Sequence, residues 1–205
     1  MEKTFTFDDI MAFPSRYRGR LMNKVSGLKP ANLIGTQASN GDANLAIFNS
    51  VVHIGANPPY IGFILRPTTV ARHTYENIKE TGVFTINQIT ESMHKQGHQT
   101  SAKYDKGVSE FDAVGLIPYH HEDFMAPFVY ESPIKIGLSF VEEQLIKVNN
   151  TRLIIGKVEH LILPEDVLLE GGDIALERLG SVAIGGLDSY YAVDKLGRYG
   201  YAEPE

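Results

Sequence analysis

Short runs rich in apolar residues recur along most of this chain, and in the clearest of them apolar and polar residues alternate with the period of two that is typical of β-strands. Residues 134–140 give the cleanest example, because four large apolar side chains alternate there with small or polar neighbours. Comparable runs predict strands at 32–36, 60–65, 83–88 and 151–163, and a weaker run suggests one at 115–119. Asn149-Asn150 predicts the hairpin turn before the last long strand. Six or more strands with few helices favour a closed antiparallel barrel.

One predicted strand has apolar side chains on both faces. Asn40-Gly41 is a strong hairpin-turn signal, so the strand that starts at residue 32 returns along residues 44–54. A strand with two apolar faces must be covered on both, by a helix, a cofactor or a partner subunit. Asn44, Asn49 and Ser50 interrupt the apolar run. Such polar side chains either have buried partners or occupy turn and edge positions.

The period changes to that of a helix from Thr69 to about Glu80, and Gly82 predicts the helix end. The predicted first turn carries the hydroxyl groups of Thr68 and Thr69, but it has no acidic residue before Glu76. This composition is unusual because acidic residues normally favour the positive N-terminal end of a helix.

Two arginines, Arg66 and Arg72, flank this predicted first turn. Cations are unfavourable there unless an anion is bound, and phosphate is the simplest such anion. An alternative without a ligand pairs Arg72 with Glu76 at i,i+4 and uses Thr68 or Thr69 as an ordinary cap. Arg66 has no comparable local partner, which favours the anion site.

The rest of the chain shows no repeat and no linker, so we expect one domain over residues 1–205. Its ends are a positively charged arm at about 1–30 and an irregular tail, rich in Gly and Tyr, at about 164–205. Residues 90–112 are polar and predict a loop.

Composition excludes several classes of protein. With 43% hydrophobic and 21% charged residues, the chain can bury a core. A net charge of −6 argues against nucleic acid as a partner. The absence of cysteine excludes disulfides, thiolate metal sites, cysteine nucleophiles and a thiol tether for a cofactor. No apolar run is long enough to span a membrane, and the N-terminus lacks a signal-peptide pattern, so we expect a cytoplasmic protein.

Two histidine groups are weak candidates for a metal site. His94 and His98 are spaced i,i+4 near Glu91, but no third ligand is fixed by the sequence. In the run 120–123 (His-His-Glu-Asp), adjacent histidines on a strand would point apart. We therefore expect no metal. No Gly-x-Gly-x-x-Gly pattern is present, so a Rossmann dinucleotide site is not expected.

Several motifs, in this order and spacing, are similar to those of the flavin reductase-like family, the FMN-binding split-barrel proteins. They are Asn32-Leu33-Ile34-Gly35-Thr36, Asn44-Leu45-Ala46-Ile47-Phe48-Asn49-Ser50-Val51, Asn57-Pro58-Pro59, Arg66-Pro67, Arg72-His73-Thr74-Tyr75-Glu76-Asn77-Ile78, Gly82-Val83-Phe84-Thr85-Ile86-Asn87, Lys106-Gly107-Val108-Ser109-Glu110-Phe111 and Gly186-Leu187-Asp188-Ser189-Tyr190-Tyr191. The resemblance covers about residues 15–195. It implies a mainly β fold, an FMN-binding split β-barrel of antiparallel Greek-key type.

The resemblance also implies where FMN would be held, without a covalent bond. The flavin ring and ribityl chain would lie against Asn44, Ala46, Ile47, Phe48, Asn49 and Ser50. The phosphate would be surrounded by Arg66, Thr68, Thr69, Arg72, His73 and Thr74, with Ser101 and Lys106 completing the site from the same or the other subunit. Members of this family are homodimers with the flavin near the interface, which would explain the doubly apolar strand.

The function expected from this resemblance is an oxidoreductase in which NAD(P)H reduces FMN and the electrons pass to a second acceptor. That acceptor would be free flavin, a monooxygenase partner protein or a metal complex. The flavin would carry the chemistry, with donors such as the Asn49 amide stabilising its reduced form. One alternative is an electron-transfer or flavin-carrier protein without intrinsic NAD(P)H activity. Another is a dimeric barrel that binds a different planar or phosphorylated ligand.

Overall fold

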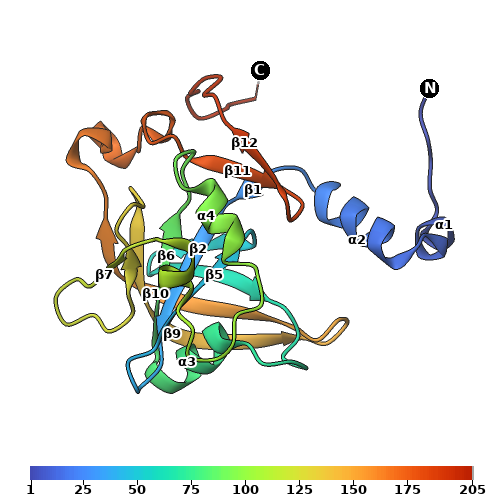
Figure 1. Cartoon of the computed structure of the whole chain (residues 1–205). Helices are drawn as coiled ribbons and strands as arrows, with labels where there is room; N and C mark the ends of the chain where they lie inside the picture. The colour runs from blue at the N-terminus through green and yellow to red at the C-terminus, as the bar shows by residue number, and fades with distance from the viewer. Residues whose placement is uncertain (205) are drawn as a thin grey trace.

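The computed structural model describes residues 1–204 and consists mainly of antiparallel strands with a few short helices (Figure 1). The strands are β1 (Lys29–Pro30), β2 (Asn32–Gln37), β3 (Ala43–Phe48), β4 (Val51–Ala56), β5 (Pro59–Leu65), β6 (Val83–Gln88), β7 (Pro118–Tyr119), β8 (Phe128–Val129), β9 (Lys135–Ile146), β10 (Thr151–Ile162), β11 (Val182–Gly185) and β12 (Ser189–Ala192). The α-helices are α1 (Phe7–Ala12), α2 (Ser15–Lys24), α3 (His73–Thr81), α4 (His94–Gln99) and α5 (Glu110–Val114). The expected mainly β fold is confirmed.

Seven strands form one sheet in the order β3-β2-β6-β9-β10-β5-β4, and every neighbouring pair is antiparallel. The two edge strands, β3 and β4, are separated in sequence only by Asn49 and Ser50. Because a two-residue connection reaches about 10 Å at most, the sheet must curl until its edges meet. In the described residues no ladder joins β3 to β4, so the barrel is split at this point.

The prediction of one continuous strand over residues 44–54 is therefore wrong. The break lies at Asn49 and Ser50, and two polar residues between two apolar runs do not by themselves predict that a strand ends there. The two halves also differ in burial. β3 lies between two apolar clusters, whereas β4 exposes Val52 and Ile54, at 42% and 40% of their surface.

The interior of the barrel is an apolar cluster that includes Ile34, Phe63, Phe84 and Leu138, all fully buried. α3 covers one end of this interior by adding Ile78 to the cluster. Register shifts in the β9–β10 ladder mark bulges, which help a sheet to bend. Close to one of them, a Cβ atom on Gly156 would lie 2.6 Å from the Phe84 ring, so glycine is required there.

A second apolar cluster covers the outer face of β2 and β3. Leu33 and Leu45 pack there against Phe111 of α5, Met93 beside α4 and Ile184 of β11. The predicted loop over residues 90–112 is thus wrong in part, because α4 and α5 lie in or overlap it. Both helices are too short to give a clear helical period, and they are stabilised by this packing instead.

Most other predicted elements agree with the structure. The strands at 32–36, 60–65 and 83–88 are present, the one at 134–140 is the first half of β9, and β9 and β10 form the expected hairpin. Asn150 adopts a positive φ of 57° in the turn. The weak run at 115–119 forms only the two-residue strand β7.

The ends of the chain are more ordered than the sequence predicts. Residues 7–24 form α1 and α2, which project from the barrel (Figure 1). Residues 165–178 contain three 3-10 helices, Glu165–Val167, Glu170–Gly172 and Leu176–Arg178. The expected irregular tail is wrong at residues 182–192, where β11 pairs with both β12 and β1. Glu205, the last residue of that expected tail, lies outside the described residues.

Candidate functional site

The segment before α3 carries the exposed side chains expected to hold a phosphate. α3 begins at His73, not at Thr69, so Thr68 and Thr69 belong to a turn that precedes the helix. Both threonines and Arg66 are exposed there. In the described residues Arg66 forms no ion pair, in keeping with the absence of a local acidic partner in its sequence.

The structure does not contain the ligand-free alternative, in which Arg72 pairs with Glu76 and Thr68 or Thr69 caps the helix. Arg72 is the N-cap residue of α3 and provides no side-chain cap. Its Nε donates to the Pro67 carbonyl oxygen at 3.3 Å. Glu76 instead accepts a hydrogen bond from the Arg72 backbone N–H at 3.3 Å and lies 3.5 Å from Lys106 Nζ. The start of α3 therefore keeps a guanidinium group without a carboxylate partner among the described residues.

Buried polar side chains join this helix to β2 and β3. Asn44 Nδ2 donates to Thr74 Oγ1 at 3.1 Å and lies 3.4 Å from Thr36 Oγ1. The same Thr36 oxygen accepts from Asn77 Nδ2 at 3.1 Å. All four side chains are buried. Asn44 thus has protein partners, and its hydrogen bonds join the strand to the helix.

β3 is the strand expected to hold the flavin. It offers a ligand its free backbone edge more than its side chains. Ile47 packs on the outer cluster and Phe48 on the interior cluster, where its ring lies 4.9 Å from that of Phe63. Ala46 is half-buried. The Leu45 N–H points away from β2 and donates to Glu110 Oε2 at 2.9 Å. Because alternate residues present both backbone groups to the same side, the N–H and C=O of Ile47 also lie on this free edge.

Asn49 and Ser50 occupy the split in the barrel. Asn49 Nδ2 donates to the Gly186 carbonyl oxygen at 2.6 Å, which ties the split to the turn between β11 and β12. Ser50 Oγ donates to the Ile64 carbonyl oxygen at 2.9 Å. One amide hydrogen of Asn49 remains available to a ligand.

A pocket of about 230 Å³ lies between the β2–β3 turn, α3 and the segment before α5. Asn44, His73 and Lys106, which the resemblance assigns to the flavin site, line this pocket together, and Asp42 and Glu80 line it as well. Ser101, at the end of α4, is exposed and is not among the lining residues.

These features have a counterpart in known proteins. A family model described as the flavin reductase like domain matches residues 28–175. The chain belongs to the flavin reductase like family. Proteins of this family bind flavin.

Solved structures agree with this membership. A split-barrel protein from Shewanella frigidimarina NCIMB 400, proposed to be a flavin reductase, has a TM-score of 0.95 and 46% identity, covering 98% of this chain and 100% of that one. Component B of nitrilotriacetate monooxygenase from Bacillus cereus has a TM-score of 0.83 and 20% identity over 97% of this chain and 99% of that one. An FMN-binding protein from Thermus thermophilus, with bound 1-cyclohex-2-enone, has a TM-score of 0.68 and 14% identity over 82% and 88%.

Some residues near this candidate site could not be given a role from the sequence. Glu110 is buried against the Leu45 N–H, and burial raises the pKa of its carboxyl group above the usual value. Glu110 belongs to one of the motifs that carry the resemblance, but a glutamate in a polar segment does not by itself indicate a buried partner. Thr36 and Asn77 were likewise hidden, because their hydrogen bonds link segments about forty residues apart.

The structure brings the histidines together in other groups than the sequence suggests. His94 and His98 do not face a common ligand: their Nδ1 atoms lie 2.6 Å from the Glu91 carbonyl oxygen and 3.1 Å from the Tyr190 hydroxyl. His121, Glu122 and His160 bring possible ligand atoms within 4.8 Å of one another. His160 comes from β10, so sequence spacing could not reveal this group. Among the described residues, no helix combines the length and apolar character needed to cross a membrane.

Proposed function

We propose that this protein is an FMN-dependent oxidoreductase of the flavin reductase type, which takes a hydride from NAD(P)H and passes the electrons to a second acceptor. The observation that carries the proposal is the cationic, hydroxyl-bearing segment 66–73 that leads into α3, whose first turn is joined to β3 by the hydrogen bond from Asn44 to Thr74. Support also comes from the match over residues 28–175 and from the protein at 46% identity.

Segment 66–73 offers groups that suit the phosphate of FMN. Arg66 and Arg72 supply positive charge, and Thr68 and Thr69 supply exposed hydroxyl groups. α3 begins without a side-chain cap, so its first N–H groups can donate to an anion. An arginine binds phosphate with fixed geometry and a charge-assisted hydrogen bond. His73 and Lys106 reach the same region from the neighbouring pocket.

The split in the barrel offers groups that suit the flavin ring of FMN. The backbone N–H and C=O of Ile47 lie on an unpaired edge, where they can bind polar groups of a flat heterocycle. Asn49 has one amide hydrogen free to donate, in a position fixed by its bond to Gly186. Ser50 continues the same edge and is held by Ile64. In this arrangement protein hydrogen bonds orient the ligand, and the apolar side chains of β3 stay in the two clusters.

FMN, when bound, would accept the hydride and release electrons singly or in pairs. The protein groups would bind and orient it, and donors at the ring edge would stabilise added negative charge. Similarity to component B of a monooxygenase supports a partner protein as the second acceptor. Free flavin and metal complexes are the other acceptors that we would test.

The decisive experiment is a visible spectrum of the purified protein with FMN, recorded without oxygen before and after NADH and then NADPH. We expect the flavin absorbance to bleach with one of the two nucleotides. A bound flavin that stays oxidised until dithionite is added would contradict the reductase and favour an electron carrier. Failure to bind FMN would contradict the whole proposal.

A further inference from the structure

The loop between β7 and β8 brings two potential metal ligands next to the end of β10. Ligand atoms of His121, Glu122 and His160 all lie within 4.8 Å of one another. His121 Nε2 is 3.8 Å from Glu122 Oε1, and the two imidazole rings lie 5.5 Å apart at 81° to each other. Ligands of one tetrahedral zinc ion lie about 3.3 Å apart, because each bond to the ion is about 2.0–2.1 Å long. Small rotations of these side chains would therefore complete a site.

A β-bulge in β10 turns His160 toward this loop. Val158 pairs with Leu138, and both pack in the interior of the barrel. Side chains two positions apart share one face of a regular strand, so His160 would follow Val158 into the interior. The register shift between them places His160 opposite Gly137 instead, because an extra residue reverses the alternation. A Cβ atom on Gly137 would lie 3.2 Å from the Phe124 ring and 3.3 Å from His160 Cβ, so this face of the sheet meets the loop.

A tight turn and aromatic packing hold the three ligands in place. The Phe124 N–H donates to the His121 carbonyl oxygen at 3.1 Å, and Glu122 lies inside this turn with a φ of 49°. The Phe124 ring packs edge-on against His160, with 5.2 Å between the ring centroids. Phe128 lies 6.4 Å from the His121 ring in the same way. Because protein contacts already position both imidazoles, less conformational freedom is lost when an ion binds.

Tyr119 determines which nitrogen of His121 is free. The Tyr119 hydroxyl lies 3.2 Å from His121 Nδ1. With Nδ1–H donating to the Tyr119 oxygen, Nε2 carries the lone pair that a metal ion needs. Nε2 is also the atom that faces Glu122. Metal-binding histidines almost always donate their other ring N–H to an oxygen atom, so this hydrogen bond is what a metal site requires.

The donor set indicates a transition-metal ion. Zinc binds imidazole and carboxylate ligands, and at three-ligand sites water takes the fourth position. Magnesium and calcium prefer oxygen ligands alone. Glu159, the residue before His160, adds no second carboxylate, because it accepts from Ser139 Oγ at 2.6 Å and from Lys157 Nζ at 3.0 Å. The chain has no cysteine that could compete for zinc.

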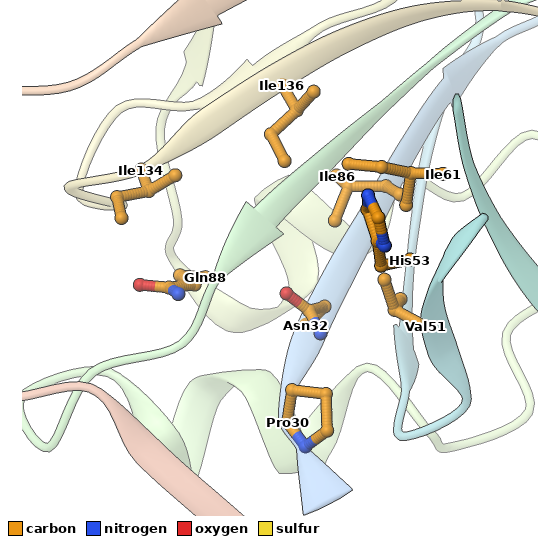
Figure 2. A pocket seen from close by; sticks show the side chains of 9 residues that line it. All are labelled: Pro30, Asn32, Val51, His53, Ile61, Ile86, Gln88, Ile134 and Ile136. Carbon is orange, nitrogen blue, oxygen red and sulfur yellow. The ribbon is translucent and has the colours of Figure 1, made fainter. Parts of the chain in front are cut away.

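His53 provides a contrast within the same chain. It lines a pocket of about 260 Å³ in the barrel (Figure 2). The lining residues are Pro30, Asn32, Val51, His53, Ile61, Ile86, Gln88, Ile134 and Ile136. This described set contains no second histidine and no carboxylate, so His53 lacks the partners that a metal ion needs.

We propose that His121, Glu122 and His160 bind one divalent transition-metal ion, for which zinc is the best fit, with water in the remaining position. The sequence alone predicts no metal here, because the third ligand comes from a distant strand. The ion joins the β7–β8 loop to β10 and stabilises the fold, since the three ligands meet only in the folded chain. This inference does not depend on the reaction that the protein performs.

The first test is a calorimetric titration of zinc chloride into the full-length protein, prepared without a histidine tag and dialysed against EDTA. We expect one ion per chain and a dissociation constant that rises about tenfold or more in His160→Ala and in Glu122→Gln. His120→Ala, His53→Ala and His94→Ala are matched controls, because each removes a histidine outside the group, and they should bind zinc like the wild type. A wild type that binds no zinc, or ligand variants that bind it normally, would overturn the proposal.

Thermal unfolding with and without zinc is the second test. Zinc should raise the unfolding midpoint of the wild type through binding to the folded state and should leave that of Glu122→Gln unchanged. Without zinc the two proteins should unfold alike, because Glu122 is exposed, which shows that the variant folds. Magnesium should have no effect on either. An equal rise with zinc in both proteins would mean that the ion binds elsewhere and would refute the site. FMN titration of the same variants tests the proposed function separately.

Discussion

Asn44 Nδ2 donates a hydrogen bond to Thr74 Oγ1 at 3.1 Å, and this contact joins the edge strand β3 to the first turn of α3. Thr36 extends the contact, because its hydroxyl oxygen lies within hydrogen-bonding distance of Asn44 and accepts from Asn77. The strand edge proposed for the flavin ring and the helix start proposed for the phosphate are thereby held in one relative position.

Removing this contact should weaken both stability and cofactor binding. We expect Asn44→Leu to lower the free energy of unfolding by about 1–3 kcal/mol, because it leaves buried hydroxyl groups without a donor. FMN affinity should fall with it. Urea unfolding and an FMN titration measure the two effects. Asn40→Leu, an exposed change in the β2–β3 turn, is the control, and equal effects of the two substitutions would contradict the role of Asn44.

Arg72 should act on the phosphate and not on the ring. We expect Arg72→Gln to weaken FMN binding about 10-fold or more, as loss of a charge-assisted hydrogen bond implies. Riboflavin, which has no phosphate, should bind the variant and the wild type alike. Fluorescence titrations with both flavins, with exposed Lys95→Gln as control, make the comparison. An equal loss for FMN and riboflavin would mean that Arg72 does not bind the phosphate.

Glu110 should make the protein less stable as the pH rises. Burial raises the pKa of its carboxyl group in the folded state, so the folded protein holds a proton that the unfolded chain releases above about pH 4.3. The free energy of unfolding therefore falls from that pH upward, through the raised pKa. Glu110→Gln keeps an acceptor for the Leu45 N–H and should remove this decline. Thermal unfolding at several pH values measures it, with Asp112→Asn, an exposed change on the same helix, as control.

Gly35 should tolerate no side chain. A Cβ atom there would lie 2.6 Å from Thr85 Oγ1 and still closer to the Pro127 carbonyl oxygen. We expect Gly35→Ala to destabilise the protein by about 1–3 kcal/mol through overpacking. Gly200→Ala, where a Cβ would meet nothing within 4 Å, should leave the unfolding midpoint unchanged. A neutral Gly35→Ala would show that β2 can shift away from the segment before β8.

Individual elements show how much of the fold could be predicted from the local sequence pattern. The strands at 32–36, 60–65 and 83–88 and the β9–β10 hairpin could be predicted because each strand is a short run rich in apolar residues and bounded by turn or loop residues. α4 and α5 could not, since helices this short form only when Met93 and Phe111 find the outer face of the barrel. The sequence pattern predicts the start of α3 at Thr69, four residues before His73, because threonines and arginines fit a turn as well as a first helical turn.

The sequence by itself determined the strand pattern, the absence of thiol chemistry and the unusual cationic segment at 66–73. The resemblance to flavin reductases also followed from local motifs, and family membership confirms it. Only the tertiary structure decided that the strand ends at Asn49 and Ser50. These two residues join opposite edges of a seven-stranded sheet. It also decided that Glu110 meets Leu45 and that the arm stands apart from the barrel. Periodicity reports which face of each element is apolar, whereas these contacts depend on how distant elements close around one core.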